Sequence, residues 1–418
     1  MTDTRHCYRP WAVLVGLLWA FPAAAQLDQT RAATFFQEAA ALCEREGGRL
    51  WGVSLCGPMV FADPVTKSIA TNQPAPAAPP PPAFGFANAA MNWGGTRWTA
   101  ISWPFMLAME QGRGQLMMHE LFHRIQPQLG LFLPDGPNDH LDTLDGRYWM
   151  QLEWRALAKA LGASGAERTA AVRDATAFRF TRRRLFAGAA ESERVMEINE
   201  GLAQYTATVV AAASGAEVVA SAIDQLSKGA QEPTFVRQFA YSSGAAYGIL
   251  LDAYNPGWTR RIKSADDLGQ LLVTAVRIRP AENADAAAKL YGGPEVRTSE
   301  EKREAEQKLR VAGLRRRFVE SPVIVLPPSR GASFSSVGMT PIPGAGTIYP
   351  TFRTAAEWGT LEAASVLMAP DRSKLTLPAP ASVEGTTLKG DGWALTIAPG
   401  WAVRPGTRPG DFQLVKEP

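Results

Sequence analysis

Two of the four histidines in this 418-residue chain fall in one short segment, MHELFHR at positions 118–124. His119, Glu120 and His123 form an H-E-x-x-H pattern. Positions i and i+4 of a helix share a face, so both imidazoles can bind one metal ion. Glu120 lies one residue further round, where a carboxylate can take a proton from water without binding the metal. The segment predicts a helix over 114–126 that carries two metal ligands and a general base; the alternative is a pair of core histidines hydrogen-bonded to carboxylates.

A catalytic zinc site needs a third protein ligand and keeps one position open for water. Glutamates recur at helical spacing in the segment ERVMEINEGLAQY, positions 193–205, amid apolar residues. An acidic stripe that faces inward is costly unless a cation or basic groups meet it. The alternative for Glu193 and Glu197 is a solvated helix face. The candidates for the third ligand are His140, Glu153, Glu193, Glu197 and Glu200.

The H-E-x-x-H pattern followed by NEGLAQY at 199–205 resembles the gluzincin metallopeptidases, especially the aminopeptidase N-like family. In that family the glutamate of the N-E-G-[FL]-A segment is the third zinc ligand. The resemblance therefore implies one Zn²⁺ ion held by His119, His123 and Glu200, and hydrolysis of peptide bonds. The interval between the two motifs is much longer here than in the family. It requires an inserted helical pair, roughly residues 141–188, and this keeps Glu153 as a competing ligand.

Two shorter segments extend the resemblance. YSSG at 241–244 has the form of the family's Y-x-x-G segment, which implies that the Tyr241 phenol hydrogen-bonds the oxyanion. The alternative is an ordinary packed tyrosine, with Tyr247 as the rival for the role. AMNWG at 90–94 resembles the family's G-A-M-E-N-W-G segment without its glutamate, the group that binds a free amino terminus. That absence argues against aminopeptidase activity, although the strand at 98–103 could still bind an extended peptide by edge pairing.

The first residues have the organisation of a secretory signal peptide. Arg5 and Arg9 precede an apolar run at 11–21, and three alanines end at Ala25. We therefore expect cleavage after Ala25 and an exported protein, periplasmic or secreted, the alternative being an N-terminal anchor. The two remaining cysteines, Cys43 and Cys56, are then expected to form a disulfide, with two buried thiols as the alternative.

Composition excludes several classes of protein. The chain is 46% hydrophobic and 20% charged, as in a soluble globular protein, and its net charge of +3 argues against nucleic-acid binding. The arginine runs at 182–184 and 315–317 are expected to be solvated helix faces. The apolar run at 206–223 is interrupted by Gly215 and Glu217, which indicates packed core, so no transmembrane segment is expected in the mature chain.

The expected fold class is α+β. It comprises a zincin-like, mostly helical catalytic domain with a small preceding β-sheet, and a small C-terminal all-β domain. The function predicted is that of an exported zinc peptidase acting on a peptide or protein. The alternatives are a non-catalytic binding or scaffold protein with a closed four-ligand site, and a metal-dependent hydrolase of a cell-envelope amide. The expected divisions are a signal peptide at 1–25, an N-terminal α+β region at 26–110, a helical domain at 111–295, a connector helix at 296–320 and a β-rich domain at 321–418.

Overall fold

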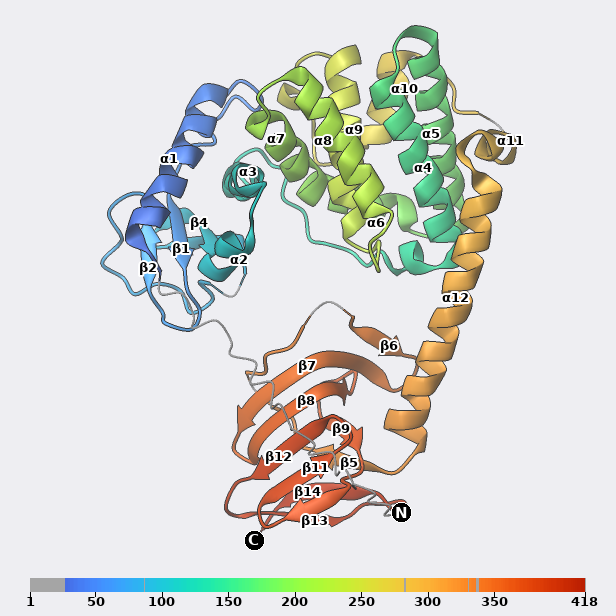
Figure 1. The fold of residues 1–418 in the computed structure, drawn as a ribbon. Coiled ribbons are helices and arrows are strands. Elements are labelled where there is room, and N and C mark those ends of the chain that lie inside the picture. Colours follow the sequence, from blue (N-terminus) through green and yellow to red (C-terminus); the bar gives the residue numbers. More distant parts are fainter. Residues whose placement is uncertain (1–26, 86, 282, 330, 336–337, 418) are drawn as a thin grey trace, which may run out of the picture. The chain divides into compact units, whose positions relative to one another are not determined.

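The computed structural model describes residues 27–417, apart from 86, 282, 330, 336 and 337 (Figure 1). The predicted signal peptide lies outside these residues. The structure mixes about 48% helix with 19% strand, in a helical region and a C-terminal β-sheet region, as the sequence predicts at this level. Two compact units are present: a first unit within Met1–His140 and Trp149–Ala287, and a second unit of Leu141–Tyr148 and Ala288–Pro418.

The first unit contains a four-stranded sheet in the order β2-β1-β4-β3. Its strands are β1 (Met59–Ala62), β2 (Ile69–Thr71), β3 (Ala89–Trp93) and β4 (Thr96–Ser102). β4 pairs in parallel with β1 and antiparallel with β3. The expectation that the strand at 98–103 offers a free edge is therefore wrong, because both sides of β4 are already hydrogen-bonded. All of the AMNWG segment except Gly94 lies in β3, which is an edge strand.

Helix α1 (Gln29–Glu46) packs against this sheet through aromatic side chains. Its first turn is capped by Asp28, whose carboxylate accepts from the backbone N–H groups of Thr30 and Arg31. Phe36 stacks on Phe61 of β1 with the ring centroids 4.4 Å apart. The apolar face of α1 thus becomes one wall of the core beside the sheet.

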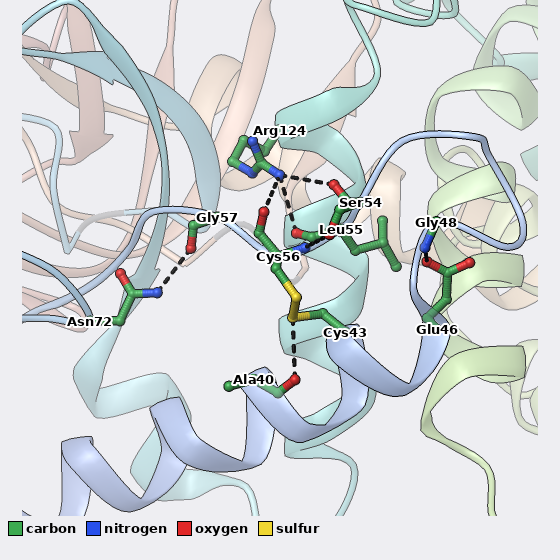
Figure 2. Close-up of a disulfide and its surroundings, with 10 residues drawn as sticks. All are labelled: Ala40, Cys43, Glu46, Gly48, Ser54, Leu55, Cys56, Gly57, Asn72 and Arg124. Carbon is green, nitrogen blue, oxygen red and sulfur yellow. Dashed lines mark hydrogen bonds between the residues drawn. A yellow bond between two sulfur atoms is a disulfide. The ribbon is translucent and has the colours of Figure 1, made fainter.

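The predicted disulfide between Cys43 and Cys56 is confirmed, with the two Cα atoms 5.2 Å apart (Figure 2). It ties the last turns of α1 to the loop that leads into β1. Arg124 Nη2 donates to the backbone oxygens of Ser54, Leu55 and Cys56 at 3.2, 3.2 and 2.9 Å. Because Arg124 directly follows His123, the loop closed by the disulfide also braces the end of the helix that carries the histidines.

The remainder of the first unit is helical. Its helices are α2 (Trp103–Ala108), α3 (Arg113–Ile125), η1 (Asp139–Asp142), α4 (Leu144–Gly162), α5 (Gly165–Leu185), α6 (Ala189–Met196), η2 (Glu197–Gly201), α7 (Leu202–Ala211), α8 (Gly215–Gly229), α9 (Gln238–Tyr254), η3 (Trp258–Arg260) and α10 (Leu268–Val276). The end of η1 and the beginning of α4 fall within Leu141–Tyr148 and so belong to the second unit. The predicted helical pair at 141–188 corresponds to α4 and α5. α3 packs on β3 and β4 on one side and on α7 on the other. In the part of the chain that the structure describes, no helix is both long and apolar enough to cross a membrane.

Helix α11 (Ala284–Ala288) and η4 (Lys289–Tyr291) lead into the second unit, where α12 (Gly293–Arg315) and η5 (Arg316–Glu320) precede the strands. The main sheet has the order β10-β11-β12-β8-β9-β5-β14-β13, with β7 also pairing β8 and β6 pairing β7. The predicted connector helix does more than connect, because Val311 and Leu314 pack against a buried cluster that contains Phe318 and Ile348. The strands are β5 (Val323–Leu326), β6 (Thr340–Ile342), β7 (Gly346–Ala356), β8 (Gly359–Met368), β9 (Leu375–Pro378), β10 (Ser382–Glu384), β11 (Thr387–Gly390), β12 (Trp393–Ile397), β13 (Trp401–Pro405) and β14 (Phe412–Lys416).

Candidate metal centre

His119 and His123 of α3 meet Glu200 of η2 in the first unit. Their Nε2 atoms are 3.0 Å apart, and Glu200 Oε2 lies 3.3 Å from His119 Nε2 and 3.5 Å from His123 Nε2. Two zinc–ligand bonds of about 2.0–2.1 Å at a tetrahedral angle place the ligand atoms about 3.3 Å apart. Within the described residues, these three form the one group of His, Cys, Asp and Glu side chains whose spacing could hold a metal ion. The structure thus brings together the three residues that the two motifs predict.

The helix that carries the histidines is held by its apolar faces. Met118, Leu121 and Phe122 are buried, and Gly112 begins the helix in the left-handed region at φ 79°. That conformation costs little only for glycine. The Thr99 hydroxyl of β4 donates to the Glu120 backbone oxygen at 3.4 Å, which links the helix to the sheet beneath it. The predicted helix over 114–126 is confirmed, within a residue at each end.

Glu200 lies in η2, a π-helical turn inserted between α6 and α7. The Leu202 N–H bonds to the Glu197 oxygen, five residues back, in place of the usual four. One extra residue in a helix rotates the side chains that follow it by about 100° about the helix axis, relative to those that precede it. The acidic stripe expected along one helix face is therefore divided: Glu193 and Glu197 point one way, and Glu200 points toward the histidines.

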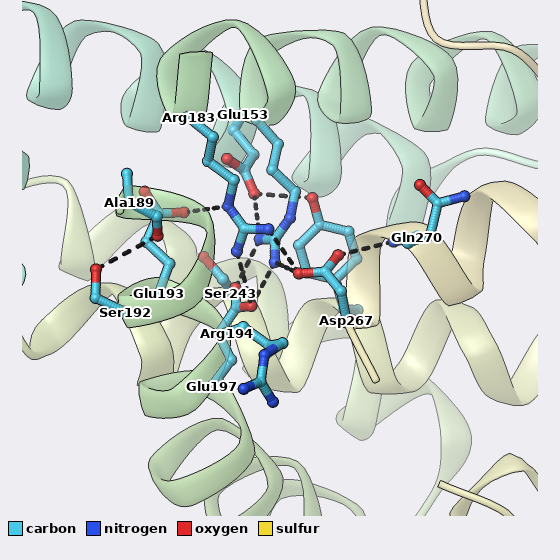
Figure 3. Close-up of polar contacts among 12 residues, drawn as sticks. Glu153, Arg183, Ala189, Ser192, Glu193, Arg194, Glu197, Ser243, Asp267 and Gln270 are labelled. Atoms are coloured by element: carbon cyan, nitrogen blue, oxygen red, sulfur yellow. Dashed lines mark hydrogen bonds and ion pairs between the residues drawn. The ribbon is translucent and has the colours of Figure 1, made fainter. Parts of the chain in front are cut away.

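The rival carboxylates bind arginines instead (Figure 3). Arg182 donates to both oxygens of Glu193 at 2.9 and 2.8 Å and to Glu153 at 2.5 Å. Arg179 donates to both oxygens of Glu197 at 2.7 and 2.5 Å. Basic groups thus meet the inward-facing acids, the condition under which burying charge is tolerated. None of the three competing glutamates joins the histidine pair.

The expectation of a solvated arginine run at 182–184 is wrong for its first two members. Arg182 is wholly buried, and the Arg183 side chain is only 6% exposed, while Arg184 is exposed. Burial raises the pKa of Glu193, but Arg182 and Arg183 outweigh it and hold that pKa well below its usual range. His140, another candidate ligand, pairs with Glu193 at 2.9 Å and so belongs to this cluster.

Each histidine of the candidate site has an amide partner on its other ring nitrogen. His123 Nδ1 lies 2.8 Å from Gln126 Oε1, and His119 Nδ1 lies 3.2 Å from Gln204 Oε1. Neither amide was predicted to have a role, although Gln204 continues the helical spacing of Glu197 and Glu200. The spacing in the sequence could have identified Gln126, because it follows His123 by about one helical turn.

Glu120 is buried beside the histidines, with 6% of its surface exposed. Its Oε2 atom has no hydrogen-bond partner within the described part of the chain. Burial raises the pKa of this carboxyl, and the pKa stays raised although His119 and His123 act to lower it. A buried carboxylate oxygen without a partner is costly, so it marks a position where water or a ligand group would be bound.

Tyr241 and Arg237 complete the surroundings of Glu200. The Tyr241 ring stacks on the His119 ring, with centroids 5.5 Å apart and planes within 10°. Burial and the neighbouring Glu200 carboxylate raise the pKa of the Tyr241 phenol. Arg237 was not predicted; its Nη2 donates to Glu200 Oε1 at 2.7 Å and its Nη1 to Asp135 Oδ2 at 3.0 Å. One oxygen of Glu200 is thereby held by an arginine while the other faces the histidines.

The rival tyrosine, Tyr247, lies elsewhere. Its phenol donates to Glu153 at 2.8 Å within the arginine–carboxylate cluster, and the side chain is fully buried. Of the two candidates, only Tyr241 contacts the histidine pair.

Comparisons with protein-family models, with curated proteins and with solved structures found no match for this chain. What the site can do is therefore inferred from its own contacts and from the chemistry of its side chains.

Proposed function

We propose that this chain is a zinc-dependent peptidase of gluzincin type. His119, His123 and Glu200 would hold one zinc ion, with Glu120 as the general base. The observation that carries the proposal is the convergence of two Nε2 atoms and one carboxylate oxygen within 3.0–3.5 Å of one another. Two imidazoles and one carboxylate form a familiar donor set of catalytic zinc, which leaves a fourth position open.

The direction of the hydrogen bonds around the histidines supports a cation at this point. Both Nδ1 atoms face amide oxygens, which can only accept, so in the neutral rings both Nε2 atoms present lone pairs to each other at 3.0 Å. Glu200 Oε2 adds a third electron-rich atom. Such an arrangement is repulsive unless a metal cation or a further proton lies among the three atoms.

Zinc bound there would supply Lewis acidity that polarises a substrate carbonyl and lowers the pKa of a bound water molecule. Glu120 Oε2, which has no hydrogen-bond partner among the described residues, would accept a proton from the attacking water and pass it to the departing amine. The Tyr241 phenol, held against His119, donates a hydrogen bond to the oxygen on which negative charge develops.

The proposal includes a zincin-like arrangement of the first unit, in which α3 packs on a small sheet. It also includes export by the signal peptide ending at Ala25, so that the substrate would be an extracytoplasmic peptide or protein. The closed four-ligand alternative is not favoured, because Glu193 and Glu197, the groups it would need, are bound by arginines.

The test combines metal analysis with substrate profiling of the purified protein. We expect one zinc per chain, cleavage of a peptide library, and loss of cleavage on treatment with a chelator. Glu120→Gln should abolish hydrolysis while zinc stays bound, and His123→Ala should lose the zinc. Glu167→Gln, a change at an exposed glutamate, is the matched control. Full activity of Glu120→Gln, or no zinc in the wild-type protein, would overturn the proposal.

A further inference from the structure

We infer that two sets of amide side chains, one buried and one half-buried, fix the tautomers of the histidine pair, so that both Nε2 atoms face the candidate metal position. One set is Gln126 alone. The other is a relay of Gln204, Gln225 and Thr208, called here the amide relay. The inference rests on the proposed function only for the identity of the metal, since the hydrogen-bond directions are a property of the chain itself.

Gln126 determines the tautomer of His123. Its Nε2 lies 3.2, 3.0 and 3.1 Å from the backbone oxygens of Leu131, Ile198 and Asn199, and the residue is fully buried. Carbonyl oxygens only accept, so the amide NH₂ must face them and Oε1 must face His123. His123 Nδ1 therefore carries a proton and donates it, which in the neutral ring leaves Nε2 with its lone pair.

The same amide links the two halves of the site. Ile198 and Asn199 precede Glu200 in η2, while Gln126 follows directly on α3. Gln126 thus orients one ligand and holds the backbone beside another, at a point where the chain segments are far apart in sequence.

The amide relay determines the tautomer of His119 in three steps. The Thr208 hydroxyl donates its single proton to the Gln204 backbone oxygen at 2.9 Å, so Thr208 Oγ1 can only accept from Gln225 Nε2, which lies 3.0 Å away. Gln225 Nε2 also donates to Ser221 Oγ at 3.1 Å, so two hydroxyls orient the Gln225 amide. Its Oε1 then accepts from Gln204 Nε2 at 3.1 Å. Gln204 Oε1 must then face His119 Nδ1 at 3.2 Å and accept its proton.

An amide acceptor and a carboxylate acceptor affect the basicity of the imidazole differently. An amide oxygen orients the imidazole without placing a negative charge behind it, whereas a carboxylate there makes the ring a more basic ligand. A metal bound at this site would therefore keep more of its Lewis acidity. Gln126, Gln204, Gln225 and Thr208 are accordingly positioning residues.

The test uses histidine labelled with ¹⁵N, which is practicable because the whole chain has only four histidines. In the metal-free protein at pH above 8, and again after addition of Zn²⁺, we expect both His119 and His123 to carry the ring proton on Nδ1. The double variant Thr208→Val with Ser221→Ala removes both hydroxyls that accept from Gln225 Nε2, so it should disturb the ring signals of His119 alone. Gln126→Leu should disturb those of His123 alone. Thr208→Ser should retain the wild-type spectrum.

Zinc affinity, measured by competition with a chelating dye, supplies a second readout. Gln126→Leu and Gln204→Leu should weaken Zn²⁺ binding by about 10- to 100-fold, while Gln204→Glu, which keeps the acceptor, should bind at least as tightly as the wild type. Gln270→Leu is the matched control, because the Gln270 side chain is exposed and its backbone makes the capping bond.

The outcomes separate this inference from the proposed function. Protons on Nε2 in the metal-free protein would overturn the relay whatever the enzyme activity. So would wild-type spectra from the double variant Thr208→Val with Ser221→Ala. The expected tautomers and zinc affinities in a protein that cleaves no peptide would uphold the relay and refute the peptidase. Should Gln126→Leu not fold, the variants at Thr208 still test the relay at His119, since Thr208 touches neither histidine ring.

Discussion

Gly201 and Gly244 lie in direct contact where η2 packs against α9. A Cβ on Gly201 would lie 3.0 Å from the Gly244 Cα and 3.1 Å from the Ala240 oxygen, and a Cβ on Gly244 would overlap the Gly201 backbone. The two glycines belong to the NEGLA and YSSG segments. Their lack of side chains is what allows the turn that presents Glu200 to approach the helix that presents Tyr241.

Gly244→Ala should therefore disrupt the site through the backbone. Overpacking of this kind costs about 1–3 kcal/mol of folding free energy, and separation of η2 from α9 should weaken Zn²⁺ binding by about 10-fold or more. Denaturant unfolding and chelator competition measure the two effects. Gly215→Ala, at a position with open space around it, is the control and should leave both unchanged. Wild-type zinc affinity in Gly244→Ala would show that the contact does not position Glu200.

The two tyrosines should separate catalysis from stability. Tyr241→Phe keeps the ring that stacks on His119 but removes the phenol, so zinc should stay bound while kcat falls by about 100-fold or more. Tyr247→Phe removes a buried hydrogen bond to Glu153 and should lower the free energy of unfolding by about 1–3 kcal/mol, with kcat little changed. Steady-state kinetics and denaturant unfolding of both variants are the measurements. The opposite pattern would assign the catalytic phenol to Tyr247.

Local sequence spacing predicted the histidine pair and Glu120 because i and i+4 positions on one helix need no tertiary information. Glu200 was predicted by the resemblance of its segment, not by spacing from the histidines. The π-turn at η2 was not predicted, since one inserted residue leaves no periodic signal in so short a stretch. The buried arginine cluster was not predicted for a different reason. The partner of Arg182 is Glu193 of α6, and local sequence does not show that α5 packs against that helix.

The competing ligands can be distinguished by their opposite effects on stability and metal binding. Glu193→Gln leaves Arg182 and Arg183 partly unpaired in a buried site, which should cost about 3–5 kcal/mol of unfolding free energy while the remaining folded protein still binds zinc. Glu200→Gln should lose zinc binding with a much smaller cost in the metal-free protein. Thermal unfolding with EDTA and with Zn²⁺ gives both quantities. Zinc-dependent stabilisation that survives Glu200→Gln but not Glu193→Gln would move the metal site to the arginine cluster.

Acid should destabilise the protein partly through Asp267. Burial raises the pKa of this carboxyl, but Arg179 and Arg183 outweigh it, so its folded pKa lies below its ordinary value near about 3.9. A folded pKa that is lowered contributes stability at neutral pH, and this contribution is lost as pH falls below the ordinary value. Asp267→Asn keeps an oxygen able to cap α10 but removes the charge, so it should cost about 2 kcal/mol at pH 7 and progressively less below pH 4. Denaturant unfolding at several pH values is the test, and a pH-independent difference would contradict this account.

Removal of the disulfide tests whether it or Arg124 holds the end of α3 in place. Cys43 and Cys56 are 13 residues apart, and closing a loop of this length stabilises the folded state by about 3 kcal/mol in the chain-entropy account. The double variant Cys43→Ser with Cys56→Ser should show that loss in denaturant unfolding. Arg124 still holds the carbonyls of Ser54, Leu55 and Cys56 in that variant, so Zn²⁺ affinity should change little. Adding Arg124→Met should then weaken zinc binding, because the end of α3 loses its remaining link to the loop. Loss of zinc affinity in the cysteine variant alone would assign the bracing to the covalent bond and not to Arg124.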